Sequence, residues 1–98
     1  MALNLYWSKK ADRKFDVIIN YLLDEWGKQA TKTFVQKVYE FLDLVVEFPE
    51  IGTMENAEKQ IRGFTIVKQV NVFYTVTEKG IILLDFFDNR QHPKRKRF

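Results

Sequence analysis

The stretch IRGFTIVKQVNVFYTVTEKGIILLDFF, residues 61–87, decides the fold of this chain. Apolar and polar side chains alternate through much of it, and β-branched and aromatic residues dominate, as is typical of half-buried strands. Gln69 and the turn-like run 78–80 interrupt the pattern, which predicts strands over 61–68, 70–77 and 81–87. Because the gaps are short, the strands are expected to form an antiparallel meander. The last strand is apolar on both faces and is therefore expected to be central and covered on each side.

Upstream of this stretch, apolar side chains recur every three or four residues, which is the period of an amphipathic helix. Ser8 is the expected N-cap of a first helix, and Gly27 is suited to the residue that stops it. A second helix follows almost at once and ends at Pro49. The short connection predicts an antiparallel helical hairpin. Residues 2–7 alternate with period two and predict a strand before the hairpin.

These elements predict an α+β fold of order β-α-α-β-β-β, with the helical hairpin packed on one face of a small antiparallel sheet. Residues 53–59 are interpreted as a polar loop. Arg62, Tyr74 or their neighbours are expected on the opposite face of the sheet. At 98 residues the chain is expected to be a single domain, 1–98, with a basic tail at 89–98.

The composition excludes several kinds of site. The chain has no cysteine, which excludes disulfides, thiolate metal ligands and a cysteine nucleophile. One histidine without cysteine cannot build the usual transition-metal sites, so no metal and no cofactor are expected. Neither a signal peptide nor an apolar run long enough to span a bilayer is recognised. A cytoplasmic protein is expected.

The basic tail, NRQHPKRKRF, holds five of the 16 Lys and Arg residues and none of the 13 Asp and Glu residues. The rest of the chain therefore carries more acids than bases. Concentrated cations beside a folded body indicate a polyanion or an acidic protein as partner. The alternative is a solvated tail that only aids solubility.

Several short motifs occur along the chain in a characteristic order. They are Trp7-Ser8 with Ala11, Ile19-x-Tyr21-Leu22 with Trp26-Gly27, Phe48-Pro49-x-x-Gly52, Ile61-Arg62-Gly63-Phe64, Val72-Phe73-Tyr74-Thr75-Val76, and Ile81-x-Leu83-x-x-Phe86-x-Asp88-x-Arg90-Gln91-x-Pro93. Over nearly its whole length the chain thereby resembles the RelE/ParE superfamily of toxins from bacterial type II toxin–antitoxin systems.

The resemblance implies a growth-inhibiting toxin, of the plasmid-stabilisation type, that a cognate antitoxin neutralises in a hetero-oligomer. ParE-like members inhibit DNA gyrase, and the long helical hairpin favours this side. RelE-like members are metal-independent endoribonucleases that cut mRNA on the ribosome, and the histidine in the basic end keeps this alternative open. A third interpretation is a basic nucleic-acid-binding module or an inactive toxin homologue. Whether the chain is an enzyme is left open.

An RNA cut without metal needs proton transfer and stabilisation of the phosphorane charge. Arg62 and Arg90 are the candidates for clamping a phosphate, and a surface ion pair is the alternative. His92 is a candidate acid or base, or a mere tail residue. Tyr74 is a candidate for base stacking or proton donation, or a packed core aromatic. The remaining candidates are cations that would contact the target or nucleic acid, with solvated surface as the alternative: Lys68, Lys94, Arg95, Lys96 and Arg97.

Overall fold

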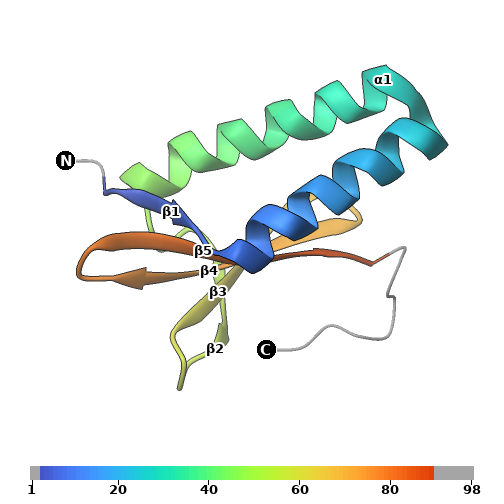
Figure 1. Ribbon diagram of the computed structural model, residues 1–98. Coiled ribbons are helices and arrows are strands. Elements are labelled where there is room, and N and C mark those ends of the chain that lie inside the picture. The colour runs from blue at the N-terminus through green and yellow to red at the C-terminus, as the bar shows by residue number, and fades with distance from the viewer. Residues whose placement is uncertain (1–2, 90–98) are drawn as a thin grey trace.

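The computed structural model describes residues 3–89 of the chain. The elements follow in the order β1 (Leu5–Trp7), α1 (Lys9–Glu47), β2 (Thr53–Asn56), β3 (Ile61–Val67), β4 (Val70–Thr77) and β5 (Gly80–Asp88). In Figure 1, α1 folds back on itself as two limbs that lie together on one face of the sheet. The predicted α+β architecture, a helical hairpin packed on a small sheet, is confirmed.

The sharp bend in α1 falls at Gly27, where the sequence predicts the end of the first helix. Gly27 has φ 88° and ψ −178°, a backbone conformation that costs glycine little but that other residues rarely adopt. A Cβ at this position would meet nothing within 4 Å, so the requirement for glycine is conformational and not spatial. The Thr31 hydroxyl donates to the Gly27 carbonyl at 2.9 Å and ties the second limb to the bend.

Ser8 begins the helix as the sequence predicts. Its Oγ accepts a hydrogen bond from the Ala11 amide at 3.0 Å, which satisfies one of the free N–H groups of the first turn. The same hydroxyl donates to the Leu84 carbonyl at 3.1 Å, and the Ser8 amide donates to the Leu83 carbonyl at 3.0 Å. The cap therefore also fastens the start of α1 to β5.

The sheet has the strand order β1-β5-β4-β3-β2. The predicted antiparallel meander is confirmed, because β3 pairs with β4 and β4 with β5 in antiparallel fashion. Within this order β4 is the central strand, and β5 lies between β4 and β1. The prediction that the last strand is central is therefore wrong by one position.

Two further features of the sheet differ from the prediction. First, β1 pairs with β5 in parallel, so the sheet is mixed and not wholly antiparallel. The long helical crossover between them is the kind of connection that parallel neighbours need. Second, Thr53–Asn56 forms the edge strand β2 against β3, where a polar loop is predicted. Backbone pairing does not depend on apolar side chains, and an edge strand tolerates polar ones.

A β-bulge in β5 redirects its side chains. Tyr74 pairs with Leu83 but Phe73 pairs with Asp85, so Leu84 is an extra residue in the ladder. Such an insertion reverses the alternation of faces beyond it. Leu83 therefore lies on the helix-side face of the sheet. Asp85 lies opposite Phe73 on the other face, where the ends of the Lys10 and Lys14 side chains of α1 still reach its carboxylate.

Apolar side chains gather in two clusters, one on each face of the sheet. The helix-side cluster lies between α1 and the sheet, and its buried members include Ile18, Phe34, Val38, Phe41, Val45, Val72, Tyr74, Leu83 and Phe86. The far-face cluster, on the opposite face, consists of Ile61, Phe73 and Phe87, with Leu84 packed against it. Within the described residues, no helix is long and apolar enough to cross a bilayer.

Candidate functional site

Tyr74 lies in the helix-side cluster and is fully buried, with 0% of its surface exposed. Its hydroxyl donates to the Pro49 carbonyl at 2.7 Å and accepts from the Gly52 amide at 2.9 Å. Burial is the main cause that raises the pKa of this phenol above its ordinary value of 10.0. In this position Tyr74 offers neither a ring face nor a free proton to a nucleic acid. Of the two predicted alternatives, this position fits the packed core aromatic, and a chemical role for Tyr74 stays a prediction.

Arg62 lies opposite Tyr74 across the β3–β4 pair. Both side chains therefore face the helices. Of the predicted alternatives for the opposite face, it is their neighbours, Ile61 and Phe73, that lie there. The guanidinium donates to the Gly52 carbonyl at 2.8 Å and to the Glu50 carbonyl at 3.3 Å. The hydrogen bonds described for this arginine thus hold the chain after the second limb of α1, and the predicted alternative of an ion pair with a carboxylate is not what they show.

Together, Arg62 and Tyr74 fix the turn at 49–52. Its glycine has no room for a side chain, because a Cβ on Gly52 would lie 2.7 Å from the Tyr74 hydroxyl oxygen and 2.9 Å from the Gly63 carbonyl oxygen. The sequence motif Phe48-Pro49-x-x-Gly52 therefore has a structural reason. Two of the four residues nominated for chemistry serve this turn.

The other nominated residues lie elsewhere. Lys68 is exposed in the turn between β3 and β4. Six candidates lie outside the described residues: Arg90, His92, Lys94, Arg95, Lys96 and Arg97. Their roles stay predictions, and the convergence of Arg62 with the basic tail stays one as well.

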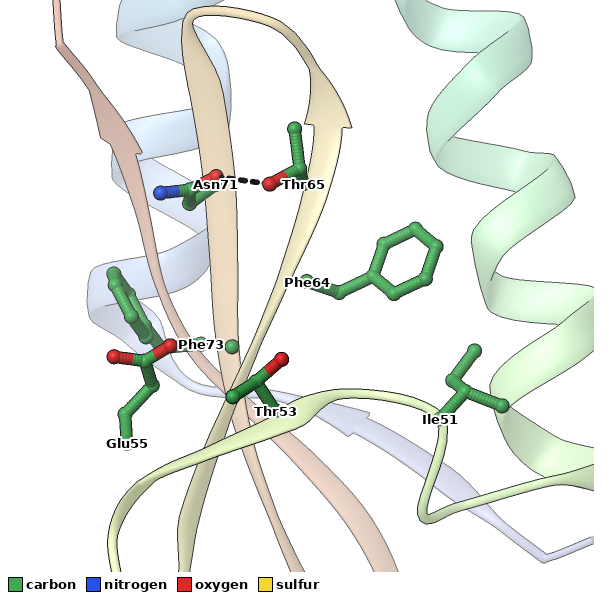
Figure 2. Close-up of a pocket in the computed structure, with 8 residues that line it drawn as sticks. Ile51, Thr53, Glu55, Phe64, Thr65, Asn71 and Phe73 are labelled. Carbon is green, nitrogen blue, oxygen red and sulfur yellow. Dashed lines mark hydrogen bonds between the residues drawn. The ribbon is translucent and has the colours of Figure 1, made fainter.

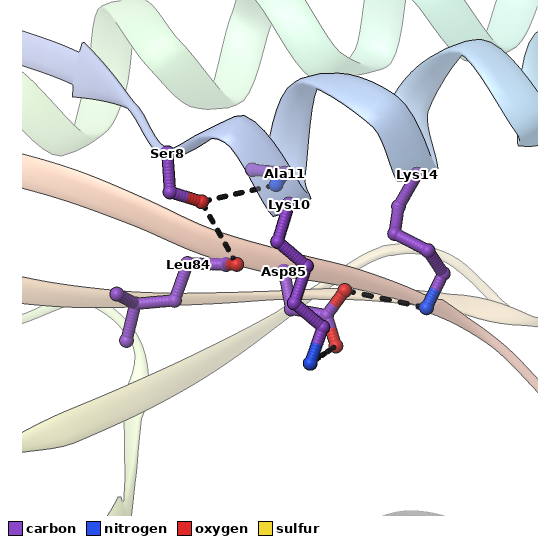
Figure 3. Close-up of polar contacts among 6 residues, drawn as sticks. All are labelled: Ser8, Lys10, Ala11, Lys14, Leu84 and Asp85. Atoms are coloured by element: carbon purple, nitrogen blue, oxygen red, sulfur yellow. Dashed lines mark hydrogen bonds and ion pairs between the residues drawn. The ribbon is translucent and has the colours of Figure 1, made fainter.

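An ionic cluster that the sequence analysis missed joins α1 to β5 (Figure 3). Asp85 is 5% exposed and accepts a hydrogen bond from the Lys14 Nζ at 3.3 Å, while the Lys10 Nζ lies 3.5 Å from its other oxygen. A buried carboxylate needs such partners, because desolvation of the charge is costly. One sequence feature could have predicted this cluster: Asp85 is the one acid inside the apolar run 81–87.

A second feature that geometry reveals is a groove along the outer edge of β3. The pairing of β2 with β3 stops at Thr53 opposite Gly63, so no described strand pairs with the outer edge of residues 64–67. This edge and the second limb of α1 enclose a hollow of about 250 Å³. A larger hollow of about 580 Å³ follows towards the bend of α1. We call the two hollows and the strand edge together the β3-edge groove.

The β3-edge groove is mostly apolar along its floor and lip. Its lining includes Leu22, Trp26, Phe34, Phe41, Leu44, Phe64, Ile66 and Val67. Trp26 and Leu44 are 60% and 43% exposed, so they present apolar surface to solvent at the mouth of the groove. Exposed apolar surface beside an open strand edge is typical of a protein-binding surface.

The far face of the sheet has a different character (Figure 2). A hollow of about 240 Å³ lies beside β2, β3 and β4 and is lined by residues that include Glu55, Asn71 and Phe73. Arg62 is the one Lys or Arg within strands β1–β5, and it faces the helices. The described strands therefore place no cation on the far face, where Glu55 and Asp85 are acidic. Within residues 3–89, no group of three His, Asp or Glu side chains is arranged to hold a metal ion.

Three solved structures illustrate the likeness of this fold. A chain of the chromosomal ParDE toxin–antitoxin system from P. aeruginosa aligns with TM-score 0.73 and 20% identity, over 89% of this chain and 96% of that one. The YoeB dimer from Staphylococcus aureus gives TM-score 0.63 and 18% identity, over 89% and 97%. The E. coli DinJ–YafQ toxin–antitoxin complex gives TM-score 0.63 and 8% identity, over 94% and 98%. At these identities the likeness concerns the fold.

Sequence comparison identifies the family. No curated protein sequence matches this chain. The profile of the family described as ParE toxin of type II toxin-antitoxin system, parDE, matches residues 5–93, which is nearly all of the chain and includes every described element. The chain therefore belongs to the ParE toxin family of type II toxin–antitoxin systems.

Proposed function

We propose that this chain inhibits growth by binding DNA gyrase, and that a cognate antitoxin neutralises it. The observation that supports inhibition by binding over RNA cleavage is the placement of Arg62 and Tyr74. Both are engaged with the backbone of the turn at 49–52, on the side of the sheet that α1 covers. The phenol of Tyr74 is buried, and one guanidinium nitrogen of the half-buried Arg62 is committed to the turn.

The electrostatics of the far face also favour a binding protein. An endoribonuclease has to hold a polyanion and stabilise additional negative charge in the transition state. The described strands offer acids there and no cation, and the nearby Lys10 and Lys14 are paired with Asp85. The RelE-like alternative is left with Arg90 and His92, which lie outside the described residues.

The β3-edge groove supports an antitoxin as partner. An extended segment can add a strand to the open edge of β3 at residues 64–67, where main-chain hydrogen bonds would give affinity. Its apolar side chains would enter the hollows beside Phe41 and Leu44. That the E. coli DinJ–YafQ structure is itself a toxin–antitoxin complex agrees with this proposal.

Two assays together distinguish gyrase inhibition from mRNA cleavage. Purified chain is added to a gyrase supercoiling reaction, and mRNA from cells that express the chain is mapped for cleavage at ribosomal A-site codons. We expect inhibition of supercoiling, DNA damage with filamentation, and intact mRNA. A-site cleavage with unaffected supercoiling would establish the RelE-like alternative instead.

The antitoxin surface is tested by Leu44→Glu, with Tyr39→Glu as the matched control on the same limb of α1. Both side chains are exposed, at 43% and 57%, but of the two only Leu44 lines the groove. A carboxylate buried in an apolar interface without a partner is costly, so Leu44→Glu should weaken antitoxin binding about tenfold or more. Equal effects of the two changes would place the antitoxin elsewhere.

A further inference from the structure

A β-bulge in β2 turns the side chain of Glu55 onto the far face of the sheet. Met54 and Asn56 pair with adjacent residues of β3, so Glu55 between them is an extra residue in the ladder. Bulges commonly re-aim a side chain in this way. A Cβ on Gly63 would lie 3.0 Å from the Glu55 Cγ and 3.2 Å from its Oε2. The Glu55 side chain therefore lies across β3, beside Phe73 (Figure 2), in the space that a larger residue at position 63 would fill.

The carboxylate of Glu55 has no cationic partner among the described residues. It is half-buried in the hollow of about 240 Å³ on this face, and within residues 3–89 it makes no hydrogen bond and no ion pair. The other polar groups of the hollow belong to Thr53, Thr65 and Asn71, and the Asn71 Oδ1 already accepts from the Thr65 hydroxyl at 2.9 Å. The hollow thus gathers oxygen atoms around one negative charge, and its low-dielectric walls strengthen the attraction of that charge for a cation.

This hollow adjoins the β3-edge groove. Phe64 and Thr65 line both the hollow and the groove, at the point where the pairing with β2 stops and the outer edge of β3 becomes open. Successive residues of a strand point to opposite faces of a sheet. A strand added to this edge would therefore place one side chain in the groove on the helix side and the next one on the far face, beside the hollow that holds Glu55.

We propose that the partner segment in the β3-edge groove carries an arginine that binds Glu55 on the far face, between two apolar residues that enter the groove. The inference rests on the proposed function, because it takes the antitoxin as the source of this segment. It adds the chemistry of the partner, which is an extended segment with an arginine flanked on each side by an apolar residue.

The reach from the strand edge to Glu55 selects a long side chain. A partner residue opposite Thr65 has the Glu55 side chain, over Gly63, as its diagonal neighbour, and such neighbours lie about 7–8 Å apart. Arginine suits this position better than lysine, because its planar guanidinium matches both oxygens of a carboxylate at once. Its remaining N–H groups can donate to the hydroxyl oxygens of Thr53 and Thr65.

Glu55 would then govern which segments the groove accepts. Apolar hollows alone discriminate weakly between amphipathic strands, whereas a carboxylate that a bound strand covers without supplying a cation is costly. A segment with an apolar or acidic residue in place of the arginine would leave Glu55 covered and unpaired. The carboxylate therefore selects against such segments and in favour of the cognate one.

The test measures the dissociation constant of the cognate antitoxin, purified as the product of the neighbouring gene, for the full-length chain and its variants. Glu55→Gln keeps the shape of the side chain and removes its charge, so binding should weaken about tenfold or more. The matched control is Glu58→Gln, in the exposed turn between β2 and β3, which should change binding less than about twofold. Equal thermal unfolding of the two variants checks that the fold is intact.

Charge reversal identifies the arginine. Glu55→Arg should weaken binding more than Glu55→Gln does, because it places two cations together. Each arginine of the antitoxin is then replaced by glutamate in turn. One replacement should restore binding to the Glu55→Arg variant while weakening binding to the unaltered chain, and the arginine that it replaces should have an apolar residue on each side.

The outcomes separate this inference from the proposed function. Unchanged binding of Glu55→Gln, together with weakened binding of Leu44→Glu, would overturn the inference and keep the groove as the antitoxin surface. Equal effects of Glu55→Gln and Glu58→Gln, or the absence of a rescuing arginine, would overturn the inference as well. If neither Glu55→Gln nor Leu44→Glu weakens binding, the inference and the proposed antitoxin surface fail together.

Discussion

The two faces of the sheet use similar apolar residues for different purposes. On the helix side, α1 covers a large cluster, and the polar atoms of Arg62 and Tyr74 are engaged in fixing the turn at 49–52. On the far face a small cluster lies among Glu55, Asn71 and Asp85. The difference teaches that polar residues within an apolar strand do not by themselves mark a site of chemistry, because the face on which they lie decides what they can reach.

The largest expected effect is the loss of stability when a phenylalanine is removed from the apolar cluster on either face of the sheet. Phe41 is 2% exposed in the helix-side cluster, and Phe41→Ala should lower the free energy of unfolding by about 4 kcal/mol, which includes the cost of the cavity. Phe87→Ala on the far face should cost less, about 3 kcal/mol, because a smaller cluster can close more of the cavity. Denaturant unfolding of both variants checks this order, and a reversed order would mean that the far face holds the main core.

The next effect concerns the buried phenol. Tyr74→Phe would leave the Gly52 amide and the Pro49 carbonyl without their partner, at a cost of about 1–3 kcal/mol in stability. Toxicity per folded molecule should stay unchanged, because the hydroxyl has a structural role. Thermal unfolding and a growth assay measure the two quantities. Loss of toxicity in a fully folded variant would restore Tyr74 as a reactive residue.

Replacing each of the two arginines that are candidates for phosphate binding should affect a different property of the protein. Arg62→Ala removes two hydrogen bonds to carbonyl groups and should lower stability by about 1–2 kcal/mol, with little change in the toxicity of the folded protein. Arg90→Ala should leave stability nearly unchanged and weaken the effect on the target. Paired unfolding and supercoiling measurements check the contrast, and identical behaviour of the two variants would contradict it.

A smaller effect is expected where α1 meets the far face. Asp85→Asn would leave Lys10 and Lys14 without their carboxylate, and stability should fall by about 1 kcal/mol. The value is modest because Lys10 is 55% exposed and its charge is well hydrated. The same change at the exposed Asp24 should cost almost nothing. Salt titration of the unfolding free energy should shrink the difference between the two variants, and an undiminished difference would point to packing.

The smallest effect is a dependence on alkaline pH. The pKa of Tyr74 is raised in the folded protein, so the unfolded chain loses this proton first as the pH rises. The resulting contribution of Tyr74 to the free energy of unfolding is fully present below the ordinary pKa of 10.0. It is lost as the pH rises from there through the folded pKa. Tyr74→Phe should therefore show a shallower loss of stability above pH 10 than Tyr39→Phe, measured by denaturant unfolding. Parallel curves would contradict this assignment.

Part of the candidate site could have been predicted from the sequence. Arg62 shares its parity along β3 with Phe64 and Ile66, which both pack on the helix side. This pattern could have placed the arginine with the core, but the sequence analysis did not use it. The β3-edge groove was not predictable, because it exists only where β2 stops and leaves the β3 edge open. The partners of Asp85 depend on the bulge at Leu84, which no alternation pattern reveals.

The sequence by itself determined the meander, the helical hairpin, the cap at Ser8 and the bend at Gly27. These features depend on residues close together in the chain, through hydrophobic period, side-chain capping and backbone conformation. The tertiary structure alone decided the parallel pairing of β1 with β5, the edge strand β2 and the faces on which Arg62, Tyr74 and Asp85 lie. Strand pairing and register join distant residues, and a one-residue shift moves every later side chain to the other face of the sheet.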